Sequence, residues 1–443
     1  MTEGLRRDGL LTIAAVGLTV VLVYAAATIS PVVALGAAIA IVIFVTLGMD
    51  RTGLLCMLGA FATAPMGRGI DSLSGHVSTP TDLLLIAGIF LLLPGIVHHK
   101  LGLPALWTSC VLLLVCLALV GSLITHTAFM SLFSLVQWIE FFMLLPAVIA
   151  WWRPSRQIIV ALLWAYVGGH MLSTAYGLME GAAPVTLRYD GLTIHPNAFG
   201  LAGLVTIAIC FYLFHHHKEQ AVRLAIVGVV FASALSIWLS GSRSALAVAL
   251  VLAIMLPLVE RSALSGFAVA GLGCLGLAAL PLAAHASGKG SALNRLLGDG
   301  TADVADSVRE TALSDGIHRF FQHPILGAGL VDVELVHNVY VEVAIATGII
   351  GLIAYIAVLF TLGRGLFGDH PERRLAWLPW AAIGIAAALP GLWDRSIWVP
   401  ASLAILPTLK EATDKVLPGQ RYLTGRTPSE QPDPPTRRLM TDA

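Results

Sequence analysis

Charged residues are scarce in this sequence of 443 residues. Only 12% of them are Asp, Glu, Lys or Arg, whereas soluble domains carry about 25%. Acidic and basic residues balance to a formal net charge of zero, so no basic surface for nucleic acid is expected. The scarcity argues against a soluble enzyme, and the balance argues against a nucleic-acid-binding protein.

Residues that could hold a metal or form a disulfide are also few. No two cysteines form a CxxC pair, and each lies inside an apolar segment, so neither disulfides nor a cysteine metal site are expected. Three adjacent histidines, residues 215–217, could suggest a metal site, but neighbours on a helix point in different directions. We interpret them as part of a solvated loop. The five cysteines are Cys56, Cys110, Cys116, Cys210 and Cys274.

Apolar residues are correspondingly frequent. They make up 57% of the chain, and the mean hydropathy of the chain is +0.85. Runs of about 20 apolar residues recur, each long enough to cross a bilayer as a helix. We therefore predict an all-α polytopic membrane protein with 12–14 transmembrane helices. The predicted spans are 9–28, 31–49, 53–66, 81–98, 104–125, 134–152, 156–178, 196–214, 221–239, 243–259, 263–284, 338–363, 375–393 and 396–410.

The first apolar run follows Arg6 and Arg7, which is also how a signal peptide begins. The run is as long as a full span and matches a cleavage site only weakly near Ala25–Ala27, so we interpret it as a retained helix. We therefore predict that residues 1–410 form a transmembrane helical bundle. The polar, Pro-rich stretch 411–443 is predicted to be a disordered cytoplasmic tail.

Loop charges predict that both termini are cytoplasmic, because cytoplasmic loops carry the excess of Lys and Arg. With this orientation the cations of the inside loops are Arg51, Lys100, Arg153, Arg156, Lys218, Arg223, Arg261, Arg364, Arg373 and Arg374. The short outside loops carry only Arg68, Arg188, Arg243 and Arg395.

Two of the outside cations are placed unusually. Arg188 precedes the Pro196-Asn197 pair that opens the next span, where Asn197 is a candidate helix cap. Arg243 lies in a very short Ser-Gly-Ser-Arg-Ser turn, beside Ser242. A charge so near the hydrocarbon is either functional or paired, or else snorkels to the headgroups. The small neighbours favour a binding role, because they admit a ligand and supply hydroxyl and N–H donors.

The third outside feature is the long loop 285–337, since loops of this length are usually functional. The stretches Leu293–Leu297 and Asp303–Phe321 have helical spacing, which predicts short amphipathic helices on the membrane surface. The loop ends at His337, where a neutral imidazole could act as a base near neutral pH. A structural histidine is the alternative.

Together these segments resemble the O-antigen ligase and O-antigen polymerase superfamily over residues 180–360. The shared features are an outside Arg188 before Gly191-x-x-x-x-Pro196-Asn197, the turn at 240–244, and a loop ending in His-Pro-x-x-Gly-x-Gly and His-Asn-x-Tyr at 323–340. The first 150 residues match only as apolar spans.

The resemblance implies a GT-C-type membrane glycosyltransferase in the cell (inner) membrane. Such enzymes transfer a glycan from a polyprenyl diphosphate to an acceptor hydroxyl on the extracytoplasmic face. The acceptor is a glycan, glycolipid or glycoprotein, and neither a metal nor another cofactor is expected. Whether this chain is a ligase or a polymerase stays open.

The resemblance also assigns roles to individual residues. Arg188 and Arg243 would bind the diphosphate, with Arg309 as a further candidate, because a guanidinium suits phosphate oxygens and stabilises the charge of the leaving group. His337 would orient or deprotonate the acceptor hydroxyl, giving transfer with inversion. The supporting residues are Ser242, Asn338, Tyr340 and Glu342, with a membrane-interface aromatic as the alternative role of Tyr340.

Two other classes of function remain open. A transporter would need charged residues inside the bundle, and the spans hold almost none apart from Glu140, which argues against ion coupling but leaves a lipid flippase open. A non-catalytic scaffold would not need the outside arginines at all.

Overall fold

The computed structural model describes residues 38–39, 42–67, 79–98, 100–125, 127–286, 290–296, 302–331, 333–389, 391–392 and 394–409. Within them the chain is helical and contains no strand. The predicted span 9–28, much of 31–49, Arg68 and the predicted tail 411–443 lie outside these residues.

The described chain up to Ala286 forms a series of helices, of which α8 and α9 are joined by the loop 181–195. They are α3 (Met49–Thr63), η1 (Ala64–Met66), α4 (Pro80–Ile96), α5 (Ala105–Ile124), α6 (Ala128–Ile139), η2 (Glu140–Leu144), α7 (Leu145–Trp152), α8 (Arg156–Glu180), α9 (Pro196–His216), α10 (Gln220–Ser240), α11 (Arg243–Glu260) and α12 (Ala263–Ala286).

The remainder alternates short and long helices. They are α13 (Ala292–Leu296), α14 (Ala302–Gln322), η3 (Val333–Val336), α15 (Val339–Gly363), η4 (Arg364–Phe367), η5 (Arg373–Ala376), α16 (Trp377–Ala386), α17 (Arg395–Ala401) and η6 (Ser402–Thr408).

Seven helical segments in the described chain are long and apolar enough to cross a membrane. They are Ala105–Ile124, Ala128–Trp152, Arg156–Glu180, Pro196–His216, Gln220–Ser240, Arg243–Glu260 and Val339–Phe367. This confirms the prediction of an all-α polytopic membrane protein. The total of 12–14 transmembrane helices stays a prediction.

Helix α9 is the most enclosed of these segments, packing against α8, α10, α11, α16 and α17. Two glycines explain how closely α10 approaches it. A Cβ at Gly203 would lie 2.5 Å from Ser236 Oγ, and one at Gly200 would lie 2.5 Å from Ser240 Oγ. Glycine at these positions therefore fixes the end of α10 beside the start of α9.

Helix α15 is broken at Gly348, whose φ of +69° departs from helical geometry. The carbonyl groups left free at the break are bonded by the segment 323–329: Ala328 N–H donates to Ile345 O (2.7 Å), and Gly329 N–H donates to the following carbonyl (3.1 Å). Backbone groups inside a membrane protein need such partners. The His-Pro-x-x-Gly-x-Gly stretch thus has a structural role, as a strap that closes the break in α15.

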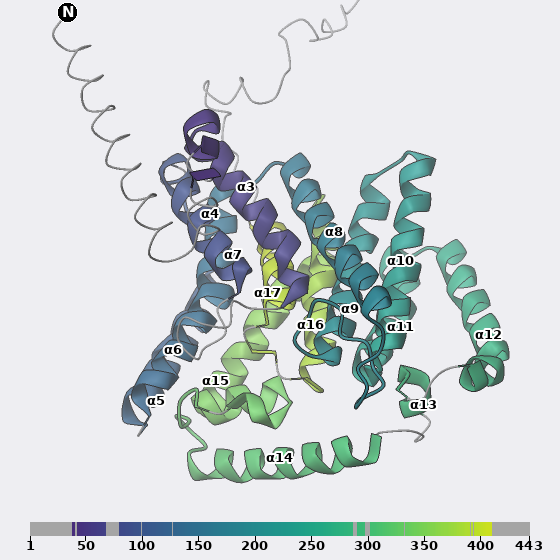
Figure 1. Ribbon diagram of the computed structural model, residues 1–443. Coiled ribbons are helices and arrows are strands. Elements are labelled where there is room, and N and C mark those ends of the chain that lie inside the picture. The colour runs from purple at the N-terminus through teal and green to yellow at the C-terminus, as the bar shows by residue number, and fades with distance from the viewer. Residues whose placement is uncertain are drawn as a thin grey trace, which may run out of the picture. The chain divides into compact units, whose positions relative to one another are not determined.

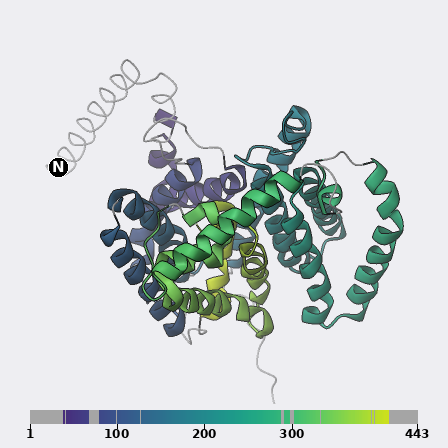
Figure 2. The same cartoon turned by 90° about the horizontal axis from the view of Figure 1, so that it is seen from below.

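Helix α14 runs across the ends of the long helices rather than alongside them (Figures 1 and 2). We use the term loop end for the end of the bundle that is covered by α14. The inner face of α14 begins with Asp306 and Arg309. It continues with Leu313 and Phe320, which pack against the core, and with Gly316, which lies against Val336. The charged half of this face therefore lies over the loop end, and the apolar half anchors the helix.

The predicted helical stretch Asp303–Phe321 corresponds to α14. Phe320 packs inward, but Val308, Ile317 and Phe321 are exposed. The inward face of α14 thus includes Asp306, which pairs with Arg243, and Gly316, which lies against Val336.

The cations predicted on opposite sides of the membrane lie at opposite ends of the bundle. Glu260, at the end of α11, pairs with Arg373 and Arg374 at the end away from α14. Arg188 and Arg243 lie at the loop end, beside the starts of α9 and α11.

Candidate anion-binding site

Arg188 is held in place by the ends of two helices. Its side chain is 6% exposed, its Nε donates to Ser240 O (2.6 Å), and its Nη2 donates to Asn197 Oδ1 (2.5 Å). The predicted cap role of Asn197 is wrong, because His195 is the N-cap of α9 and its Nδ1 accepts from Asn197 N–H (3.1 Å). The amide of Asn197 is therefore used to orient Arg188.

The turn between α10 and α11 requires glycine. Gly241 has a φ of +65°, and a Cβ there would lie 2.3 Å from Gly290 O and 2.9 Å from Arg188 Nε. Ser242 then caps α11 by accepting a hydrogen bond from Ala245 N–H (3.4 Å). The Ser-Gly-Ser-Arg-Ser turn thus places Arg243 at the first position of α11, next to Arg188.

Arg243 contacts both helices of the long loop. Its Nη2 forms a very short ion pair with Asp306 of α14, and its Nη1 donates to Arg295 O (3.4 Å) in α13. Arg295 is only 2% exposed, and its Nη1 donates to Gly241 O (2.8 Å).

Arg295 was not among the residues predicted from the sequence. Its Nε is buried without a hydrogen-bond partner, which is unusual for a guanidinium. The available signal was weak: a cation within the stretch Leu293–Leu297 that has helical spacing. Only the fold reveals that α13 packs against the ends of α10 and α11.

Four guanidinium groups thus gather at the loop end, and we call them the arginine cluster: Arg188, Arg243, Arg295 and Arg309. Burial and the charges of the other three lower the pKa of Arg188 to about 9, so it is still protonated at neutral pH. Burial and neighbouring arginines also lower the pKa values of Arg295 and Arg309. Asp306 is the acidic group that opposes them, and contact with Arg243 lowers its own pKa. The cluster carries excess positive charge.

Two histidines lie within electrostatic range of the cluster. Burial and the charge of Arg309 lower the pKa of His337, which favours the neutral ring at neutral pH. Desolvation and the cations around it, led by Arg188 and Arg309, lower the pKa of His195 to about 4, and His337 contributes to this shift. The two rings and the arginines therefore belong to one neighbourhood, although they come from separate segments.

His337 has two features that are uncommon for a structural residue. Its φ is +58°, a conformation that few non-glycine residues adopt and that often marks functional sites. Its Nδ1 is buried without a hydrogen-bond partner. The ring is thus held in a strained position with a nitrogen that no described residue bonds.

The remaining predicted supporting residues serve mainly to build α15. Asn338 caps the helix by accepting from Val341 N–H (3.2 Å), and its Nδ2 donates to Ala387 O (3.1 Å). Tyr340 donates to Ile383 O (2.9 Å) and thereby joins α15 to α16. Glu342 is fully buried inside the bundle. These contacts position His337 without adding their own groups to the arginine cluster.

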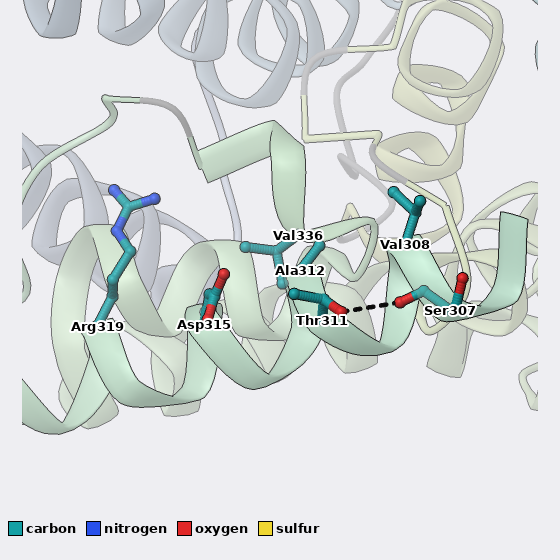
Figure 3. Close-up of a pocket in the computed structure, with 8 residues that line it drawn as sticks. Ser307, Val308, Thr311, Ala312, Asp315, Arg319 and Val336 are labelled. Atoms are coloured by element: carbon teal, nitrogen blue, oxygen red, sulfur yellow. Dashed lines mark hydrogen bonds between the residues drawn. The ribbon is translucent and has the colours of Figure 1, made fainter. Parts of the chain in front are cut away.

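Two hollows adjoin the loop end. One, of about 720 Å³, lies between η1, the loop before α9 and the turn before α17, and His195 is part of its wall. The other, of about 530 Å³, is a groove between α14 and Val336 (Figure 3). In Figure 3 Thr311, Asp315 and Arg319 follow one side of α14, and none of the predicted site residues lines this groove.

The helices and this site together define a polytopic helical membrane protein with a cationic site at one end of its bundle. No protein-family model and no curated protein sequence matches the chain. Among the described residues, no group of three or more His, Cys, Asp or Glu side chains could hold a metal ion. The functional interpretation therefore depends on the geometry of the site and on the short motifs.

Proposed function

We propose that this protein transfers a glycan from a polyprenyl diphosphate to an acceptor hydroxyl at the extracytoplasmic face of the cell membrane, as a GT-C-type polysaccharide ligase or polymerase. The observation that carries the proposal is the arginine cluster beside His337. Four guanidiniums opposed by Asp306 suit a ligand with several negative charges, and a lipid diphosphate is one that membrane helices can admit.

In the proposed reaction, His337 accepts the proton of the acceptor hydroxyl. The acceptor oxygen forms a bond to the anomeric carbon of the donor sugar on the side opposite the diphosphate. The bond from that carbon to the diphosphate oxygen breaks, its electron pair leaves with the diphosphate, and the anomeric configuration inverts. The guanidiniums stabilise the charge that develops on the leaving group.

The orientation follows from the loop charges. The end opposite α14 carries Glu260 with Arg373 and Arg374, while the cations of the loop end converge on the cluster. An excess of loop cations predicts the cytoplasmic side, which would leave the cluster outside.

The test compares Arg188→Ala, Arg188→Lys, Arg243→Ala and His337→Ala in protein that reaches the membrane in normal amounts. Each variant is assayed for glycan transfer and for binding of undecaprenyl diphosphate in nanodiscs. The arginine variants should weaken binding, Arg188→Lys included, because an ammonium cannot reproduce the fork that bonds Ser240 and Asn197. His337→Ala should retain binding and lose transfer.

Other outcomes would contradict the proposal. Full transfer by the Arg188→Ala and Arg243→Ala variants would remove the diphosphate role and would favour a scaffold. Movement of a lipid-linked glycan across liposomes without bond formation would favour a flippase instead.

A further inference from the structure

The cavity of about 720 Å³ at the loop end is large enough for a small ligand and is not used by the diphosphate role of the arginines. Its wall comes from four parts of the chain: η1, the start of α4, the segment before α9 and the segment around α17. His195 belongs both to this wall and to the surroundings of Arg188. The cavity therefore lies directly beside the arginine cluster.

The charged groups in the cavity wall are already paired with each other or with the backbone. Arg395 forms a two-pronged ion pair with Asp82 (2.9 and 2.8 Å). Asp394 accepts hydrogen bonds from the backbone and the hydroxyl of Ser396 (2.8 and 2.6 Å). A second anion would find no excess of cations here, in contrast to the arginine cluster.

His195 presents a neutral donor at this border. Its Nδ1 accepts from Asn197 N–H, so in the neutral ring the proton is on Nε2. With a pKa lowered to about 4, the ring stays neutral at physiological pH. Nε2–H is therefore a hydrogen-bond donor, and His195 is not a suitable base.

The rest of the wall combines hydroxyl groups with apolar surface. Thr79, Thr193 and Ser396 provide oxygens, whereas Pro65 and Leu392 are apolar. Hydroxyl-bonding groups beside apolar surface match a sugar ring, which has hydroxyls at its edge and C–H groups on its faces.

We propose that this cavity binds a sugar ring, held through His195 Nε2–H, next to the diphosphate on the arginine cluster. This inference rests on the proposed function and names the part of the substrate that the cavity takes. The ring belongs to the donor, because a sugar linked to a diphosphate on Arg188 lies next to His195. An acceptor sugar would use the same chemistry, and the experiment separates the two sources.

Two substitutions test the cavity without removing the helix cap or the arginines. Ala198→Met fills the cavity from α9, and His195→Asn keeps a residue that caps helices well while removing Nε2–H. The matched controls are Ala268→Met on exposed α12 and His318→Asn on exposed α14. The probes are undecaprenyl diphosphate, the same lipid carrying one N-acetylglucosamine, and a diphosphate-free N-acetylglucosamine tetrasaccharide.

Binding of each probe is measured in nanodiscs. The sugar-bearing lipid should bind wild type more tightly than the bare lipid. His195→Asn should weaken the sugar-bearing lipid roughly 2- to 12-fold, the value of one neutral hydrogen bond, and leave the bare lipid unchanged. Ala198→Met should remove the advantage of the sugar, and both controls should behave as wild type.

If the two cavity variants weaken only the tetrasaccharide, the cavity binds a sugar of the acceptor. If they change the affinity of no sugar-bearing probe, or weaken the bare lipid equally, the inference is wrong. Failure of the proposed function is distinct from both results, because it would appear as unchanged binding of bare undecaprenyl diphosphate to the Arg188→Ala protein.

Discussion

Like charges repel, and the arginine cluster is held together against this repulsion by the fold. Carbonyl groups at the end of α10 and in the Gly241 turn accept from Arg188 and Arg295, and Asp306 pairs with Arg243. In the proposed function a ligand phosphate would contact Arg243, which Asp306 already contacts, so this carboxylate would compete with the ligand.

Asp306→Asn should therefore strengthen the binding of undecaprenyl diphosphate. The carboxylate is partly exposed, so its removal should lower the dissociation constant by about 1.4- to fivefold, in line with a surface ion pair of roughly 0.2–1 kcal/mol. The affinity is measured by titrating undecaprenyl diphosphate into the protein in nanodiscs at low and high salt. The control is Asp315→Asn, on the groove side of α14. Weaker binding by Asp306→Asn would mean that this carboxylate supports the site instead of competing for it.

The pH dependence of transfer should report His337. Its pKa lies below the ordinary histidine value, and the base must be unprotonated, so kcat/KM should be constant near neutral pH and fall only below about pH 6.5. Arg309→Gln removes a cation that lowers this pKa, so the acid limb should move to higher pH. A limb that stays in place in Arg309→Gln, or that persists in His337→Ala, would contradict the role of His337.

At the scale of elements, the segment 323–329 has a structural role at the break in α15. The break at Gly348 would leave backbone groups without partners inside the bundle, and the segment 323–329 supplies them. The same segment leads from α14 back to α15, so closing the break also helps to position α14 over the arginine cluster.

Gly348→Ala should destabilise the protein strongly. The new Cβ would lie 2.1 Å from Ile325 O, and the backbone conformation at Gly348 alone costs about 1–3 kcal/mol for other residues. Gly228→Ala, in a helix with nothing within 4 Å, should instead be neutral or stabilising by up to about 1 kcal/mol. Thermal unfolding in detergent compares the two, and equal melting temperatures would show that the strap is dispensable.

At the scale of the whole molecule, two charged clusters lie at the two ends of α11, one at Arg243 and the other at Glu260. The far end is stabilised by Glu260, whose side chain is 8% exposed and bonds both Arg373 and Arg374. This cluster ties α11 to η5 at the end of α11 opposite to Arg243, so the two ends should respond independently to mutation.

Glu260→Gln should lower the melting temperature while leaving diphosphate affinity unchanged. Removing the carboxylate leaves two neighbouring arginines, each with a side chain 24% exposed, without their acidic partner, at a cost of about 1–3 kcal/mol, less than for a fully buried pair. Thermal unfolding and lipid binding are measured on the same preparation. A large loss of affinity at constant stability would show that the two ends are coupled.

The all-α membrane class and seven of the predicted spans followed from the sequence alone. Hydropathy and loop charge are local properties: the predicted span 156–178 corresponds to α8, and 243–259 to α11. The residues predicted for the site were recognisable because arginines and a histidine are unusual beside apolar spans.

Only the tertiary structure decided what these residues meet. Arg295 and Asp306 join the site because α13 and α14 fold back over the ends of α10 and α11, a result of long-range packing that leaves no local pattern. The same holds for Asn197, which orients Arg188 rather than capping α9, and for the cavity at His195, whose wall comes from four distant segments. Periodicity and composition describe neighbours along the chain, whereas a site depends on distances across it.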